Sequence, residues 1–186
     1  MRLSEKHQLT ATVTNKEFND GAHRLVEAFN QILALHFWTH RIRPHLEKQP
    51  DFRDALPAFD NAILESCLAT FRALDVFFAN RVNAGRKDDL FAKDFNGFVA
   101  KHGLLTSKQR EKLNKTVFHF TKRHLLAQIE KYEYGSMLAR AIPLCIDFID
   151  HVRAYAQYNL NDEDRVKFLD DTRRHLETLG ARYKNS

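Results

Sequence analysis

One long segment, residues 59–81, constrains the fold more than any other part of the chain. Placed on an α-helix at about 100° per residue, its apolar side chains cover three sides of that helix. These side chains are Ile63, Leu64, Cys67, Leu68, Phe71, Leu74, Phe77 and Phe78. A helix that is apolar over most of its circumference has to be surrounded by other elements, so the segment predicts the central helix of a bundle.

Helical periodicity extends through most of the remaining chain, which has only six glycines and four prolines to interrupt it. We therefore predict an all-α fold, a single helical bundle of about five helices. Besides the central helix, we expect helices over residues 20–46, 106–131, 136–158 and 162–180. Residues 1–14 are expected to form a loosely ordered N-terminal arm, and residues 15–186 one helical-bundle domain.

Local signals predict where these helices begin, bend and end. The sequence TSKQ, which starts at Thr106, has the form of a capping box and is expected to begin the third helix. Pro44 and Pro143 predict kinks near the end of the first helix and within the fourth. The last helix should begin after Asn161, with an acidic first turn, and should end at Gly180. The inward side of the fourth helix is expected to carry Leu138, Ala141, Ile142, Cys145, Phe148, Ile149 and Val152.

A chain of 186 residues can bury a core without a disulfide or a structural metal. Cys67 and Cys145 lie in apolar stretches, so we expect buried free thiols, which are typical of a reducing compartment. The sequence has no signal-peptide pattern and no apolar run of about 18 residues, so we expect a cytoplasmic protein that does not enter a membrane. A net charge of +5 allows a nucleic-acid partner without requiring one.

The third expected helix has one strongly basic face. That face carries Lys108, Lys112, Lys115, His119, Lys122 and Arg123, whereas Leu113, Val117, Phe120 and His124 fall opposite. A histidine among cations can exchange a proton with a ribose hydroxyl while its neighbours hold the phosphate. The simpler interpretation is a solvated helix face that happens to contain a histidine.

Three stretches of the chain, LESCLATFRALDVFF, RKDDLFAKDF and NKTVFHFTKR, resemble the HEPN superfamily of bacterial helical domains, near its abortive-infection members. The resemblance covers about residues 20–155. It implies a bundle of four to five helices, often dimeric, in a defence or toxin–antitoxin setting. It also implies metal-independent RNase activity, for which many members use an arginine, a polar residue and, further on, a histidine.

Matched to that motif, His119 takes the place of the histidine and Lys115 that of the polar residue, but Asn114 stands where the arginine should be. Without a guanidinium the bidentate phosphate clamp is lost, and lysine does not replace it. Arg123, one turn beyond His119, is the other cation within reach. The resemblance therefore leaves two alternatives, an RNase with a degenerate motif and a domain that acts through binding alone.

Acidic residues elsewhere are expected to form structural polar contacts. We predict that at least one of Asp88, Asp89 and Asp94 pairs with His119 or Arg123, because no recognised ligand spacing supports a metal site there.

On the central helix, Glu65, Arg72 and Asp75 share one stripe and predict an internal salt-bridge network, with a catalytic carboxylate pair as the alternative. His36 and His40, one helical turn apart, lack the glutamate of a metalloprotease motif and are expected to be a semi-buried pair.

The leading hypothesis is a HEPN-like domain that binds RNA, or a partner protein such as a cognate antitoxin, with RNase activity left open and no cofactor. RNA contacts are expected from Lys108, Lys112, Lys115 and Lys122. The alternative is a non-enzymatic protein-interaction bundle whose basic helix is merely solvated.

Overall fold

The structure is a computed structural model, which describes residues 15–79, 91–95, 97–117, 134–155 and 163–183. The long helices in these ranges are α1 (Asn15–Phe37), α3 (Leu56–Ala79), α4 (Ser107–Val117), α5 (Tyr134–Tyr155) and α6 (Glu163–Tyr183). Shorter elements are the π-helical turn η1 (Trp38–Ile42), α2 (Arg43–Leu46) and the 3₁₀ turns η2 (Pro50–Phe52) and η3 (Ala92–Asp94). No strand occurs in the described residues, so the prediction of an all-α bundle of about five helices is confirmed.

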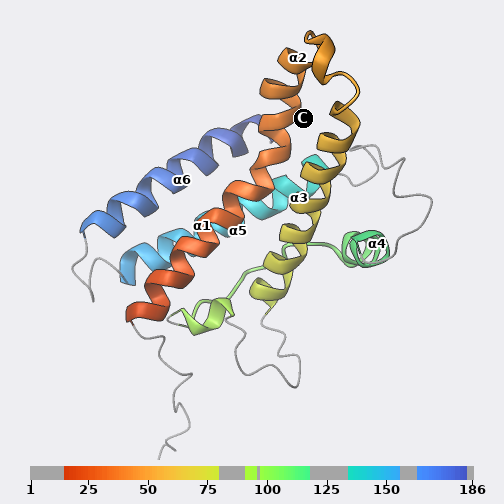
Figure 1. Cartoon of the computed structure of the whole chain (residues 1–186). Coiled ribbons are helices and arrows are strands. Elements are labelled where there is room, and N and C mark those ends of the chain that lie inside the picture. Colours follow the sequence, from red (N-terminus) through yellow and green to blue (C-terminus); the bar gives the residue numbers. More distant parts are fainter. Residues whose placement is uncertain (1–14, 80–90, 96, 118–133, 156–162, 184–186) are drawn as a thin grey trace, which may run out of the picture.

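Figure 1 shows α1 and α3 side by side and antiparallel, joined at one end by η1, α2 and η2. In this view α5 lies behind the two, and α6 packs along α5. Helix α4 lies on the side of α3 away from α6. Helix α3 therefore has neighbours on several sides, as its apolar surface requires.

One hydrophobic core joins α1, α3, α4, α5 and α6. Helix α3 contributes Leu64, Cys67, Leu68, Phe71, Leu74, Phe77 and Phe78, all buried, as predicted for a central helix. The seven residues predicted for the inward side of α5 are also all buried. The pattern of apolar side chains thus identified the buried faces of both helices correctly.

The aromatic residues after the central helix belong to this core. Phe95 and Phe98 meet the ring of Phe148 edge to face, with centroids 5.4 and 5.1 Å apart. Phe77 of α3 joins them, 5.9 Å from Phe95 and 5.4 Å from Phe148. Edge-to-face packing of this kind fixes the segment around η3 against α3 and α5.

The expected first helix, 20–46, is interrupted earlier than Pro44 predicts. Helix α1 ends at Phe37, and the chain passes through η1 before α2 resumes at Arg43. Pro44 lies in the first turn of α2 and has no N–H, so it cannot donate to the carbonyl of His40. A wider π turn just before the proline accommodates this missing bond.

A tyrosine from α5 also enters the hydrogen-bond ladder of α1. The hydroxyl of buried Tyr134 donates to the carbonyl of Ile32 at 2.5 Å and accepts from the N–H of His36 at 3.3 Å. A regular α-helix would join these two backbone groups directly. One rung below, the thiol of Cys67 donates to the carbonyl of Gln31 at 3.0 Å. Side chains from α3 and α5 thus donate hydrogen bonds to two consecutive carbonyls of α1, those of Gln31 and Ile32. Side chains that enter the backbone hydrogen bonding of a helix are a recognised cause of helix distortion.

The prediction that the last helix ends at Gly180 is wrong, because α6 continues to Tyr183. A Cβ on Gly180 would lie 3.0 Å from Cγ2 of Ile142 on α5. The glycine therefore allows α6 to approach α5 closely and does not end the helix. The acidic first turn, Glu163 and Asp164, is present as expected, whereas the cap candidate Asn161 lies outside the described residues. Pro143 lies within α5, and the kink expected there stays a prediction.

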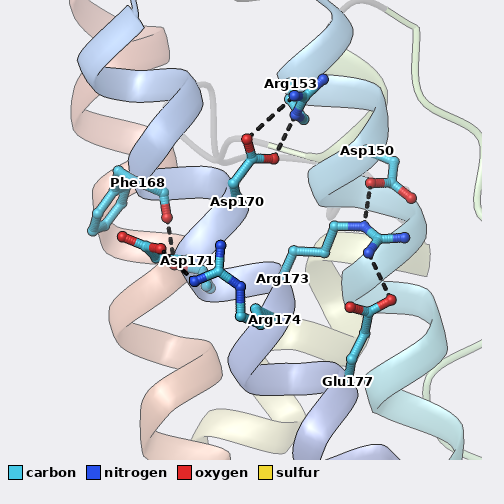
Figure 2. A network of polar contacts seen from close by, with 9 residues as sticks. Asp150, Arg153, Phe168, Asp170, Asp171, Arg173, Arg174 and Glu177 are labelled. Atoms are coloured by element: carbon cyan, nitrogen blue, oxygen red, sulfur yellow. Dashed lines mark hydrogen bonds and ion pairs between the residues drawn. The ribbon is translucent and has the colours of Figure 1, made fainter.

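Helices α5 and α6 are also joined by arginine–carboxylate pairs on their exposed sides. Figure 2 shows Arg153 of α5 holding Asp170 of α6 through two bonds, of 2.5 and 3.2 Å. In the opposite direction, Arg173 of α6 reaches Asp150 of α5 at 2.7 Å. The reciprocal pairs cross-link the two helices on the outside of the core.

Candidate functional site

The best-defined polar region surrounds the beginning of α4. The hydroxyl of Thr106 accepts from the N–H of Gln109 at 3.2 Å, and the side chain of Gln109 accepts from the N–H of Thr106 at 2.9 Å. These reciprocal bonds confirm the predicted capping box. The amide of Gln109 also donates to the hydroxyl of Ser136 at 3.1 Å, which ties the start of α4 to α5.

A buried ion pair holds this helix against α3. Arg110 donates from Nε to Oδ2 of Asp75 at 2.5 Å and from Nη2 to Oδ1 at 2.9 Å. Oδ1 also accepts from the N–H of Leu105 at 3.1 Å, just before the helix begins. The Asp75 side chain is only 4% exposed, and its hydrogen bond raises the pKa of Arg110 above the ordinary value. The pair fixes the position of α4 against α3.

These contacts decide which side of α4 faces solvent. Gln109 and Leu113 are buried, whereas Lys108 and Asn114 are exposed and Lys112 is half-buried. The buried side of α4 thus lies opposite the arc of lysines predicted from the sequence. At the start of α4 the basic face is turned outward.

The loop before α4 carries or contacts three further basic groups, Lys101, His102 and Arg140. The carbonyl of Gly103 accepts from Nη2 of Arg140, on α5, at 2.9 Å, and Nδ1 of His102 lies 3.1 Å from the same oxygen. Lys101 pairs with Asp147 of α5 at 2.9 Å. Residues 101–103 are therefore attached to α5 by two basic side chains.

The predicted RNase residues lie mostly beyond what the structure describes. His119, Lys122 and Arg123 lie outside the described residues, as do Asp88 and Asp89.

Lys115 belongs to α4, but its side chain is not among those described, and Asn114 is exposed. Asp94 accepts from the N–H of Phe91 at 2.8 Å and caps η3. The predicted pairing of Asp88, Asp89 or Asp94 with His119 or Arg123 stays a prediction.

The residues of the predicted polar stripe on the central helix differ in burial. Asp75 is buried, Arg72 is half-buried and Glu65 is exposed. The ion pair that Asp75 makes is with Arg110 of α4. Asp75 therefore serves to attach the next helix, which a wheel drawn for one helix does not reveal.

The histidines of α1 and η1 lie together, with ring centroids 4.5 Å apart, but only His36 is half-buried, whereas His40 is exposed. Next to them, Nε1 of Trp38 donates to Asp60 at 2.6 Å, and Arg43 holds the same carboxylate. In the described part of the chain no group of three histidine, cysteine or acidic side chains is placed to hold a metal ion.

Both cysteines are buried free thiols, as predicted. Burial raises the pKa of Cys67 to about 11, and burial also raises the pKa of Cys145. Since the thiolate is the reactive form, neither side chain is suited to act as a nucleophile.

Two arginines of this region were missed at the level of sequence. Arg110 falls on the side of α4 opposite the lysines, and an arginine away from the basic face is a signal of a buried acidic partner. Arg140 is the lone charged residue in the apolar stretch 134–146, which is a signal of a specific polar role.

No helix among the described residues is long and apolar enough to span a bilayer. Comparisons with known protein families, with curated proteins and with solved structures find no match for this chain.

Proposed function

We propose that this chain is a HEPN-like helical domain that binds RNA through the outward face of α4, in the defence or toxin–antitoxin setting that the resemblance implies. The observation that supports the proposal is the orientation of α4. Its neutral side is buried through Gln109 and Leu113, and the pair of Asp75 with Arg110 holds it in place. Lys108 is exposed on the outward side of α4 and Lys112 is half-buried there, and both are positioned to approach a polyanion.

The chemistry of binding is neutralisation of phosphates by lysine. Each phosphate contact with a single strand releases bound counterions, so the logarithm of the affinity falls with the logarithm of the salt concentration by about 0.7 per contact. Such contacts position an RNA without reading its sequence. We therefore expect affinity for single-stranded RNA with little dependence on base composition.

The test is a salt titration of binding to a labelled single-stranded RNA, measured by fluorescence anisotropy. Lys108→Ala and Lys112→Ala should each weaken binding and flatten the salt slope by about 0.7. Lys167→Ala is the matched control, because Lys167 is equally a surface lysine but lies on α6. Absence of binding by the wild type at about 50 mM salt would overturn the proposal.

Cleavage is tested separately, by incubating the same RNA with the protein in the presence of a chelator. If the domain is a degenerate RNase, His119→Ala should abolish cleavage while binding is kept. Asn114→Arg, a change at an exposed position, should raise the activity by restoring the missing guanidinium. If neither the wild type nor Asn114→Arg cuts RNA, the domain acts through binding alone.

The competing function, binding of a partner protein such as a cognate antitoxin, is favoured by the turn between α1 and α3. Phe37, Phe52 and Phe59 are 57%, 45% and 46% exposed there. Large exposed aromatic side chains in one region are typical of a protein-binding surface. Phe52→Ser with Phe59→Ser should leave RNA affinity unchanged if α4 is the RNA-binding face.

A further inference from the structure

Arg140 carries a half-buried charge that no carboxylate matches within the described part of the chain. The one hydrogen bond it makes there runs from Nη2 to the carbonyl of Gly103. Its buried Nε has no hydrogen-bond partner. A guanidinium has five N–H donors, and leaving a buried donor unpaired is costly. The environment of Arg140 is therefore one that an anion with several acceptor oxygens would complete.

Other nitrogen donors surround the same glycine. His102 places its ring nitrogen Nδ1 3.1 Å from the carbonyl oxygen of Gly103. A Cβ on Gly103 would lie 3.7 Å from Nη2 of Arg110 and 3.4 Å from the carbonyl of Leu105. Gly103 thus has no side chain beside the guanidinium of Arg110, whose Nη2 also donates to the carbonyl of Leu105 at 3.4 Å.

The acids that contact this region already have cationic partners. Asp75 is bound by Arg110, and Asp147 is bound by Lys101 at 2.9 Å. Among the residues that the structure describes around Gly103, Arg140 is the cation that no carboxylate pairs with. The imbalance favours a negatively charged ligand.

We infer that Arg140 binds a phosphate group beside Gly103, with His102 and the positive charge of Arg110 close by. The planar fork of a guanidinium matches phosphate oxygens, and a glycine allows the anion to approach the backbone. The inference deepens the proposed function and rests on it where the phosphate is that of an RNA backbone. A free phosphate group has the same chemistry, and the experiment below separates the two sources.

The test combines RNA binding with thermal melting. Arg140→Gln should weaken the affinity for single-stranded RNA by about tenfold and flatten the salt slope by about 0.7. Arg140→Lys should recover the slope but not the full affinity, because lysine keeps the charge and lacks the fork. Gly103→Ala should weaken binding and also flatten the slope, because a methyl group in this space keeps the phosphate from its contact although no charge is removed. Arg24→Gln, at an exposed position on α1, is the control.

The second part of the test uses inorganic phosphate as the ligand. It should raise the melting temperature of the wild type above that in sodium chloride of equal ionic strength, and should raise that of Gly103→Ala much less. If RNA is bound but Arg140→Gln and Gly103→Ala bind it like the wild type, the inference is wrong and the proposed function stands.

If RNA is not bound but inorganic phosphate still stabilises the wild type over Gly103→Ala, the proposed function fails and the site takes free phosphate. If neither ligand has an effect, both are wrong. Should Arg140→Gln melt too early for the assay, Arg140→Lys and Gly103→Ala decide the result.

Discussion

The guanidinium of Arg110 and the carboxylate of Asp75 face each other across the interface between α4 and α3, with their closest atoms 2.5 Å apart. The same carboxylate accepts from the N–H of Leu105. One buried acid therefore holds both the helix and the loop that leads into it. Removing one partner of a buried pair leaves the other charged and unpaired, which costs more than the pair itself contributes.

We expect Asp75→Ala to lower the free energy of unfolding by about 3–5 kcal/mol, because it leaves Arg110 and the N–H of Leu105 without the carboxylate that they bind. Asp75→Asn should cost less, since it keeps an acceptor oxygen. Urea denaturation measures both changes. Asp171→Ala, which breaks an exposed pair with Arg174 on α6, should change stability by under about 1 kcal/mol. Equal effects of the substitutions at positions 75 and 171 would contradict the buried role of Asp75.

The capping box at the start of α4 makes a second prediction. Thr106→Ala should cost about 1 kcal/mol, because it removes the acceptor for the N–H of Gln109. Thr106→Ser should be close to the wild type. The control is Thr178→Ala, because that hydroxyl only contacts the carbonyl of Arg174 within its own helix. A Thr106→Ala protein as stable as the wild type would show that the cap contributes nothing.

Hydrogen exchange can test the contribution of the Tyr134 hydroxyl to the stability of α1. In Tyr134→Phe the N–H of His36 loses its bond to the tyrosine oxygen, and the carbonyl of Ile32 loses the O–H that donates to it. We expect a loss of about 1–2 kcal/mol in stability and faster exchange at His36 than in the wild type. Unchanged protection at His36 would mean that the helix closes its own bond when the hydroxyl is absent.

Thiol labelling checks the raised pKa values of the two cysteines. Burial raises the pKa of Cys67 to about 11, and that of Cys145 is also raised, so little thiolate exists near pH 8. In the native protein, a disulfide reagent should label neither side chain on the time scale of a free thiol. In denaturant both should react at once. Rapid labelling without denaturant would contradict the burial of the reacting cysteine.

The pair of Arg153 with Asp170 predicts a dependence of stability on pH. The hydrogen bond from Arg153 holds the pKa of Asp170 below its ordinary value. A carboxyl group with a lowered pKa in the folded state stabilises the fold above its unfolded pKa of about 3.9 and loses that contribution as the pH falls through the folded value. The wild type should therefore be more stable than Arg153→Gln at pH 7, with the difference disappearing below about pH 4.

The control for that experiment is Arg174→Gln, because its partner Asp171 is a more exposed acid on the same helix. Its difference from the wild type should be smaller at every pH. If the difference in the free energy of unfolding between the wild type and Arg153→Gln stays constant from pH 7 to about pH 3, the carboxylate of Asp170 is not its source.

Local chemistry was sufficient to predict much of this fold. The apolar pattern of α3 and α5 identified their buried sides, and Thr106 with Gln109 marked the start of α4. These features follow from contacts within one helix or one turn, so residues close together in the sequence determine them. The same reasoning correctly predicted Cys67 and Cys145 as buried thiols.

Contacts between distant segments were beyond this reasoning. The partner of Asp75 lies 35 positions away, and Tyr134 meets a carbonyl 102 positions away. A glycine near the end of a helical pattern is typical of a helix end, yet Gly180 lies inside α6. A glycine is needed there because Ile142 of α5 occupies the space that a side chain would take. A helical wheel gives the direction of a side chain but not what lies there. The attachment of α4, the contact of Tyr134 with α1 and the donors around Gly103 were therefore decided when the helices packed, since each depends on which oxygen or side chain a neighbouring helix brings within a few ångströms.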